Sequence, residues 1–234
     1  MCIRDSDDPV TIIIPFRNRK EHLDMYLKMI QTYKTSTPYE VIIVEQEDGK
    51  PFNRGFILNI GFTLRNPSTD YVIFNDVDII PTEPMFQEYM KKTDCCRYLS
   101  AHKNCLGGVA GFRPTCFKNS NGFPNVIFEW GVEDRVLFYR IKHKGYIIKN
   151  ENNTLSNSSV VNKFIINPNN DSDPRTISKW LKSYSDTQQK AFLNRHIDNT
   201  FQHLLQSDGL NTLPKITVVE QHNIGNIKHV KVSI

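Results

Sequence analysis

The sequence predicts an α/β fold organised around a parallel β-sheet. Three short apolar segments rich in β-branched residues, at 10–15, 40–45 and 71–75, have the composition of buried strands. Two segments with the periodicity of amphipathic helices separate them. Strand, helix, strand, helix and strand in succession is the pattern of parallel α/β sheets, whose ligands bind beyond the carboxyl ends of the strands.

Each of these elements has a local signal for its bounds. The first strand ends at Pro15, and the helix after it stops before Pro38. The second helix is expected to start near Asn53, after a turn at Asp48-Gly49. The apolar faces of the two helices consist of residues spaced three or four apart: Leu23, Leu27 and Ile30, then Phe56, Ile60 and Leu64.

The later elements have weaker signals. Short amphipathic helices are expected at 84–92 and from residue 133 onward, and a helical pattern covers 177–205. Closing strands are expected at 215–219 and 228–234. Residues 150–174 are rich in Asn and Ser and lack apolar periodicity, which predicts a long mobile loop.

Composition excludes several classes of protein. The net charge of +4 suits binding of a small polyanion such as a nucleotide diphosphate. No basic stripe with interleaved aromatic residues occurs, so nucleic acid is not an expected partner. No apolar run approaches the roughly 20 residues needed to span a bilayer, and the polar N-terminus lacks a signal-peptide core.

The five cysteines are Cys2, Cys95, Cys96, Cys105 and Cys116. Their odd number and the adjacent pair are not typical of a disulfide framework, and no Cys-x-x-Cys zinc spacing exists. The sequence therefore predicts free buried thiols, which favour a reducing compartment.

Two carboxylates follow the third strand directly. The strand period predicts that Asp76 and Asp78 share a face and can reach one ligand, for which a divalent cation is suited. Arg17 and Arg19 follow the first strand, so they are expected at the same edge, as half of a phosphate-and-metal site. The simpler alternative is a solvated Asp-x-Asp turn with arginines as surface charges.

A second group of candidate residues lies near position 130. Trp130 precedes Glu133 and Asp134, which open a helix. An aromatic ring beside carboxylates is typical of sugar binding, although acids in a first turn are also favoured by the helix dipole, by roughly 0.3–1 kcal/mol. Upstream, Gly107 and Gly108 lack the spacing of a Walker loop and indicate either close approach to a ligand or a tight bend.

Seven motifs occur in a specific order over about residues 10–220. They are IIIPFRNR at 12–19, FNR at 52–54 with LNIGF at 58–62, DVD at 76–78 with IP at 80–81, GGV at 107–109, NGFPN at 121–125, WG at 130–131 with ED at 133–134, and SDGLN at 207–211. In this order they resemble the catalytic domain of the β-1,4-galactosyltransferase family, including its N-acetylgalactosaminyltransferase relatives.

The resemblance implies a GT-A fold, with a single mixed α/β sheet flanked by helices, and inverting transfer of a sugar from a UDP donor to a sugar hydroxyl. It implies donor binding by Pro15, Phe16, Arg17, Arg19, Arg54, Asp76, Val77, Gly107, Gly108 and Trp130, the last on a mobile loop. By the same resemblance, Asp78 ligates Mn²⁺, Asp134 is the general base and Glu133 orients hydroxyl groups.

This chemistry suits the residue types. Single displacement needs one base opposite the leaving group, and a carboxylate suffices. The departing diphosphate needs charge neutralisation by arginines and a metal acting as Lewis acid. A hydrolase with two catalytic carboxylates is the rival class, but it would not need the arginine-rich first loop.

The resemblance is incomplete at the metal. The family has a downstream Met-x-x-His motif, whereas no Met or His occurs between Gly145 and Arg195. Ungapped counting from Glu133 places Lys163 at the histidine position. Either Lys163 replaces part of the metal's charge, or the loop realigns and a more distant residue or water completes the shell.

Three further departures concern the substrates and a disulfide. Cys105 replaces the tyrosine of galactose-using members, and its smaller side chain favours UDP-GalNAc or mixed donor use. Arg135 interrupts the family's acidic run, which departs from the pattern for N-acetylglucosamine acceptors. Val72 replaces a family cysteine, so the disulfide expected there is missing.

We therefore predict four parts: an unstructured leader at 1–9, a nucleotide-sugar half at 10–112, an acceptor and catalytic half at 113–220 with the mobile loop, and a C-terminal strand at 221–234. The expected partners are UDP-galactose or UDP-N-acetylgalactosamine and an acceptor glycan. The alternative is an inactive UDP-sugar-binding or glycan-binding member of the same fold. The resemblance implies the Golgi lumen behind a lost anchor, whereas the thiols favour the cytoplasm.

Overall fold

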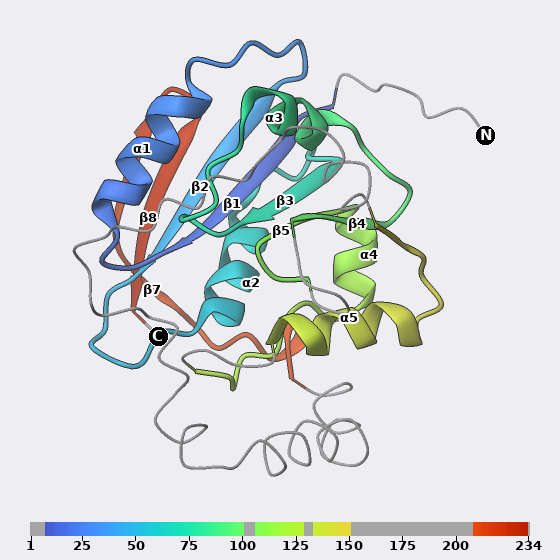
Figure 1. Ribbon diagram of the computed structural model, residues 1–234. Coiled ribbons are helices and arrows are strands. Elements are labelled where there is room, and N and C mark those ends of the chain that lie inside the picture. Colours follow the sequence, from blue (N-terminus) through green and yellow to red (C-terminus); the bar gives the residue numbers. More distant parts are fainter. Residues whose placement is uncertain (1–7, 101–105, 129–132, 151–207, 234) are drawn as a thin grey trace, which may run out of the picture.

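The computed structural model describes residues 8–100, 106–128, 133–150 and 208–233, which form one mixed β-sheet flanked by helices (Figure 1). Most of the predicted leader, nearly all of the predicted mobile loop and the predicted helix at 177–205 lie outside the described residues. None of the helices in these ranges has the length and apolar character that crossing a bilayer requires.

The predicted alternation of strands and helices is confirmed in the first 75 residues. The elements are β1 (Val10–Phe16), α1 (Lys20–Ile30), β2 (Tyr39–Gln46), α2 (Arg54–Leu64) and β3 (Tyr71–Asn75). β1 lies between β2 and β3 and is parallel to both, with Ile13 opposite Ile42 and Phe74. The carboxyl ends of the three strands therefore meet at one edge of the sheet.

The later elements extend the sheet on both sides. They are α3 (Glu83–Met90), β4 (Cys96–Ser100), β5 (Val109–Phe112), α4 (Pro114–Asn119), α5 (Glu133–His143), β6 (Ile148–Asn150), the 3₁₀ turn η1 (Leu210–Thr212), β7 (Thr217–Ile224) and β8 (Ile227–Ser233). The strand order is β6-β4-β5-β3-β1-β2-β8-β7. The sheet is mixed because β5 is antiparallel to β3 and β4, and β7 is antiparallel to β8.

The strand expected at 215–219 is in fact longer and shifted. β7 begins at Thr217 and continues to Ile224, paired with β8 along an edge whose residues are all exposed. Because neither face of β7 is buried, its sequence has no apolar period that could mark its end.

Both faces of the central strands are buried, which explains why their sequences are continuous apolar runs. Ile13, Val72 and Phe74 pack with α2, α4 and α5 on one face. Ile12 and Ile73 pack with α1 and α3 on the other. Figure 1 shows the same separation, with α1 and α3 apart from α2, α4 and α5.

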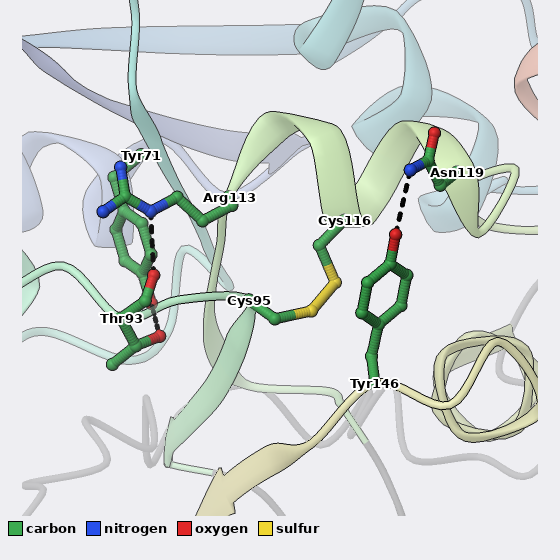
Figure 2. Close-up of a disulfide and its surroundings, with 7 residues drawn as sticks. All are labelled: Tyr71, Thr93, Cys95, Arg113, Cys116, Asn119 and Tyr146. Carbon is green, nitrogen blue, oxygen red and sulfur yellow. Dashed lines mark hydrogen bonds between the residues drawn. A yellow bond between two sulfur atoms is a disulfide. The ribbon is translucent and has the colours of Figure 1, made fainter. Parts of the chain in front are cut away.

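The prediction that all cysteines are free is wrong. Cys95 and Cys116 form a disulfide, with their Cα atoms 5.4 Å apart (Figure 2). The antiparallel pairing of β4 with β5 returns the chain beside Cys95, because Phe112 lies opposite Cys96 and α4 follows at once. Cys96 is free and buried, and burial raises its thiol pKa well above the ordinary value.

Candidate functional site

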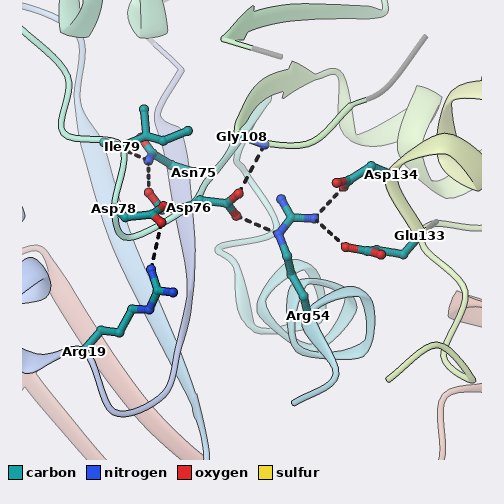
Figure 3. Close-up of polar contacts among 9 residues, drawn as sticks. All are labelled: Arg19, Arg54, Asn75, Asp76, Asp78, Ile79, Gly108, Glu133 and Asp134. Carbon is teal, nitrogen blue, oxygen red and sulfur yellow. Dashed lines mark hydrogen bonds and ion pairs between the residues drawn. The ribbon is translucent and has the colours of Figure 1, made fainter. Parts of the chain in front are cut away.

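Four segments bring charged side chains together at the carboxyl edge of the parallel strands (Figure 3). The loop after β1 supplies Arg19, and the first residue of α2 supplies Arg54. The turn after β3 supplies Asp76 and Asp78, and the start of α5 supplies two more acids. This is the edge at which an α/β sheet is expected to bind its ligand.

Arg54 lies at the centre of this cluster and pairs with acids from two elements. Its Nε donates to Asp76 Oδ1 at 2.6 Å, and its Nη1 donates to Asp134 Oδ1 at 2.5 Å. Nη1 also lies 3.6 Å from Glu133 Oε1. Since only 11% of the Arg54 side chain is exposed, these charge-assisted contacts are well shielded from water.

The local sequence fixes where α2 begins and therefore where Arg54 points. Asn53 caps the helix by accepting from Phe56 N at 3.0 Å. The Asn53 backbone N–H donates to Gln46 Oε1 at 2.8 Å, which ties the cap to the end of β2. The Arg54 guanidinium also lies 5.8 Å from the centroid of the Phe123 ring.

The cluster contains more acids than cations. Burial, aided by the charge of Asp134, raises the pKa of Glu133 to about 8 against the opposing effect of Arg54. Burial also raises the pKa of Asp76 to about 6, again against Arg54 and with the help of Asp78. Burial and the neighbouring acid thus favour the protonated form of Glu133.

Two buried atoms of this cluster have no hydrogen-bond partner within the described residues. They are Arg54 Nη2, a donor, and Glu133 Oε2. An unsatisfied buried polar atom costs about 1–3 kcal/mol, so a ligand that pairs with it gains that interaction. Each of these two atoms therefore keeps a hydrogen-bonding capacity that a polar ligand group such as a hydroxyl would satisfy.

The two glycines before β5 allow the chain to pass close to both groups of acids. A Cβ at Gly107 would overlap Asp134 Oδ2, so a larger residue there would have to displace this carboxylate. Gly108 has a φ of +73° and its N–H donates to Asp76 Oδ2 at 3.2 Å. The segment thus bends at Gly108 and passes close to Asp134 at Gly107, whereas its expected approach to a ligand stays a prediction.

Asp76 and Asp78 pair with different arginines, whereas the strand period predicted a common face and a common ligand. β3 ends at Asn75, and Ile79 N donates to Asp76 O at 2.9 Å, so the two acids lie in a turn. Asp78 accepts from Arg19 at 2.7 Å, with 43% of its side chain exposed. A turn, and not a strand face, therefore presents the two carboxylates, and each pairs with a different arginine.

Other predicted site residues lie around this cluster. The side chains of Phe16 and Val77 are buried in the apolar packing on the α1 side of the sheet, and Pro15 is buried in β1. Arg17 donates to the Lys50 carbonyl and lies over the Phe52 ring. Three further predicted residues, Trp130, Cys105 and Lys163, lie outside the described residues.

The chemistry of a divalent-cation site is partly present. Asp78 offers a half-exposed carboxylate, a hard donor of the kind that Mn²⁺ accepts. Within the described ranges, no group of three or more His, Cys, Asp or Glu side chains could hold a metal. Asp78 therefore fits as one ligand, and diphosphate oxygens and water are suitable donors for the remaining positions.

Arg140 is a buried site-supporting residue that the sequence analysis missed. It lies on α5 seven residues after Glu133, and its Nη1 donates to Gly122 O at 2.6 Å. It also contacts the Asp208 carbonyl, and the Asp208 carboxylate accepts from Asn125 N at 2.7 Å. Arg140 thus connects the NGFPN and SDGLN motifs. In the sequence, the one feature that could have indicated this role is a cation on the apolar face of the helix.

A mixed sheet of this order, with arginines and acids at its carboxyl edge, defines a GT-A-like glycosyltransferase fold. Residues 2–90 match the model for the N-terminal region of glycosyl transferase group 7, and residues 87–161 match that for the N-terminal domain of galactosyltransferase. The chain belongs to the β-1,4-galactosyltransferase family.

Individual relatives from this family are similar to the chain in sequence. β-1,4-Galactosyltransferase 6 of Rattus norvegicus is 35% identical over 151 residues, which cover 58% of this chain and 39% of the relative. The chain thus spans about two fifths of the length of the curated relatives it matches.

Solved structures support the fold. The catalytic domain of Drosophila β-1,4-galactosyltransferase 7 in complex with xylobiose superposes with a TM-score of 0.74 at 20% identity, covering 97% of this chain and 94% of that one. A mutant of the same enzyme, in complex with manganese, UDP-Gal and xylobiose, gives a TM-score of 0.73 at 20% identity and the same coverage.

Proposed function

We propose that this chain carries the site of an inverting glycosyltransferase. It moves galactose or N-acetylgalactosamine from a UDP donor to a hydroxyl of an acceptor glycan and forms a β linkage by single displacement. Asp134 is the base in this proposal. The proposal is supported by the family of the chain and by UDP-Gal and xylobiose in the complex of the Drosophila relative.

The observation that carries the proposal is the pairing of Arg54 with Asp76 and Asp134 at 2.6 and 2.5 Å. The Arg54 guanidinium thereby holds Asp76, which we propose to contact the donor, at a fixed distance from Asp134, the proposed base. Positioning of this kind lowers the entropic part of a reaction barrier.

In the proposed reaction, Asp134 accepts the proton that is released and UDP is the leaving group. Asp134 takes the proton of the acceptor hydroxyl while the acceptor oxygen forms a bond to the anomeric carbon of the donor sugar. The bond between that carbon and the UDP oxygen breaks on the opposite face, and UDP leaves with the electron pair. Arg17 and Arg19 neutralise charge on the diphosphate, and a Mn²⁺ ion held by Asp78 supplies Lewis-acid stabilisation when bound.

We propose for Arg54 a different role from the one implied by the resemblance, and for Glu133 the same role, the orientation of hydroxyl groups. Arg54 is already paired with carboxylates, so we propose that it positions Asp134 and leaves only Nη2 for the donor. A protonated Glu133 can donate to a sugar hydroxyl and accept from another. Nη2 and the Glu133 carboxyl are thus two separate candidates for hydrogen bonds to hydroxyls of the donor or acceptor.

Three finer points of the proposal rest on the comparison of the sequence with the family pattern. The small side chain of Cys105 favours acceptance of an acetamido group, and Lys163 either replaces part of the metal charge or leaves that task to realigned residues or water. Trp130 closes over the bound donor. We also propose the division into a nucleotide-sugar half at 10–112 and an acceptor half at 113–220.

A donor screen tests the proposal. Purified protein is incubated with UDP-Gal, UDP-GalNAc, UDP-Glc and UDP-GlcNAc and a panel of acceptor sugars, each with Mn²⁺ and with excess chelator. Transfer from UDP-Gal or UDP-GalNAc is expected, with inversion at the anomeric carbon. Hydrolysis without transfer, or strict preference for a glucose-type donor, would contradict it, and complete loss in chelator would exclude charge replacement by Lys163.

The missing Met-x-x-His motif favours one second candidate, an inactive UDP-sugar-binding or glycan-binding protein. The screen separates the two. Binding of UDP and glycan by calorimetry without transfer from any donor would support the binding protein.

A further inference from the structure

Asn75, the last residue of β3, makes hydrogen bonds with every polar atom of its side chain. Its Oδ1 accepts from Tyr26 Oη at 3.0 Å and from Tyr89 Oη at 2.6 Å. Its Nδ2 donates to Asp76 O at 2.7 Å and to Ile79 O at 2.9 Å. The side chain is fully buried, directly behind the turn that carries the two aspartates (Figure 3).

The chemistry of the partners fixes how the amide is oriented. Carbonyl oxygens can only accept, so the NH₂ group must face Asp76 O and Ile79 O. The two tyrosine hydroxyls then donate to Oδ1, and burial raises the pKa of both phenols, so they keep their protons. No isosteric side chain offers two donors on one side and an acceptor on the other.

The four bonds connect α1 and α3 to the turn. Tyr26 belongs to α1 and Tyr89 to α3, and both hydroxyls meet at Asn75. Through Nδ2 the amide then fixes the backbone on either side of Asp78, since one accepting carbonyl precedes Asp78 and the other follows it. The positions of α1 and α3 thereby help to fix the backbone that carries the Asp78 carboxylate.

We propose that Asn75 is a positioning residue, which fixes the Asp76-Val77-Asp78 turn so that Asp78 is presented for a divalent cation bound together with a nucleoside diphosphate. The proposal rests on the proposed function, because the cation and the diphosphate belong to that site. Asn75 itself touches neither the cation nor the diphosphate, and it acts only through the turn.

The test uses the purified chain and two direct measurements. Mn²⁺ affinity is measured in the presence of UDP by electron paramagnetic resonance of the free ion, and Ile79 amide protection is measured by hydrogen exchange. In Asn75→Asp the shape is kept, but an oxygen replaces the NH₂ group facing two carbonyls. We expect Mn²⁺ affinity to fall by about tenfold or more and Ile79 exchange to accelerate. Tyr89→Phe, which removes one donor to Oδ1, is expected to lower the affinity about two- to fivefold.

Tyr71→Phe is the matched control. It removes another buried tyrosine hydroxyl, which bonds Thr93 Oγ1 at 3.0 Å (Figure 2) and is not among the partners of Asn75. It is expected to lower the melting temperature and to leave Mn²⁺ affinity unchanged. Should Asn75→Asp fail to fold, the comparison of Tyr89→Phe with Tyr71→Phe decides the question.

The outcomes separate the two claims. Wild-type protein that binds Mn²⁺ with UDP, and variants at Asn75 and Tyr89 that bind equally well, would overturn the positioning role alone. Equal loss of affinity in Tyr71→Phe would also overturn it, because the effect would then be general destabilisation. Wild-type protein that binds neither Mn²⁺ nor UDP would overturn the proposed function and the positioning role with it.

Discussion

Gly107 lies against the carboxylate of Asp134, so closely that no side chain can be added at position 107 without moving the acid. The Leu106 N–H also donates to the Asp134 carbonyl at 3.4 Å, so the segment before β5 contacts both the backbone and the side chain of Asp134. The double glycine of the sequence thus has a structural reason. It makes room for the proposed base.

Gly107→Ala is expected to lower kcat by about 100-fold or more, because displacement of a positioned group by 1 Å has an effect of that size. The added methyl group overlaps Asp134, while the arginines proposed to hold the diphosphate are untouched. UDP binding measured by calorimetry should therefore persist. Gly145→Ala is the control for general destabilisation: it strains a backbone with a φ of +77°, but nothing lies within 4 Å of its added methyl group, so loss of kcat there would show a general effect.

Arg54→Lys is expected to abolish most of the transfer activity although the charge is kept. A lysine ammonium cannot bridge Asp76 and Asp134 with the planar geometry of a guanidinium. Arg54→Ala should in addition destabilise the fold by about 3–5 kcal/mol, because it leaves buried carboxylates without their cation. Urea unfolding measures this loss.

The exposed pair Lys20–Asp24 provides the comparison for Arg54. Lys20→Ala should change the free energy of unfolding by no more than about 0.5 kcal/mol. A similar small change in Arg54→Ala would contradict the central place of Arg54 in the cluster.

Glu133 predicts a specific pH dependence of stability. Its folded-state pKa, about 8, is raised above the ordinary value of 4.5, so the folded protein holds this proton more tightly than the unfolded chain. The stabilisation from this group is complete below pH 4.5 and is lost as the pH rises through about 8. Asp76, with a pKa of about 6, has the same sign over a lower range.

Glu133→Gln isolates the pH-dependent contribution of Glu133 to stability, because glutamine imitates the neutral acid at every pH. The difference in unfolding free energy between the variant and the wild type should move in favour of the variant between pH 5 and 9, as measured by urea titrations. Parallel curves over this range would show that Glu133 is not the protonated acid.

Arg19 forms an ion pair at 2.7 Å with Asp78, the carboxylate that we propose as a ligand of the metal. Arg19→Ala should therefore strengthen binding of Mn²⁺ alone by a few-fold, consistent with the roughly 0.2–1 kcal/mol of a partly exposed pair. Binding of UDP with Mn²⁺ should weaken, since the diphosphate loses a cation. Changes of the same sign in both measurements would contradict the dual role.

Much of the fold could be predicted because its central strands are buried on both faces and its helices are amphipathic. Strands β1, β2 and β3 and helices α1 and α2 were expected within a few residues of their actual bounds. The disulfide could not be predicted, since only the antiparallel return of β5 brings Cys116 to Cys95. The extent of β7 was also hidden, because an exposed edge strand has no apolar period.

The candidate site was predicted in its residue types but not in its pairings. The sequence indicated Arg54, Asp76 and Asp134, yet the local period placed Asp76 with Asp78, whereas the turn after Asn75 directs it to Arg54. The partners of Arg54 lie 22 and 80 residues away from it in the sequence. The spacing within a motif cannot predict pairs so far apart.

The most direct test of the central claim is the activity of Asp134→Asn with UDP-Gal or UDP-GalNAc and an acceptor sugar. The variant keeps the shape of the side chain and removes its capacity to take a proton. Transfer should fall by at least about 100-fold, while UDP binding measured by calorimetry stays within about twofold of wild type. Unchanged transfer in the variant would show that Asp134 is not the base, and the proposed mechanism would be wrong.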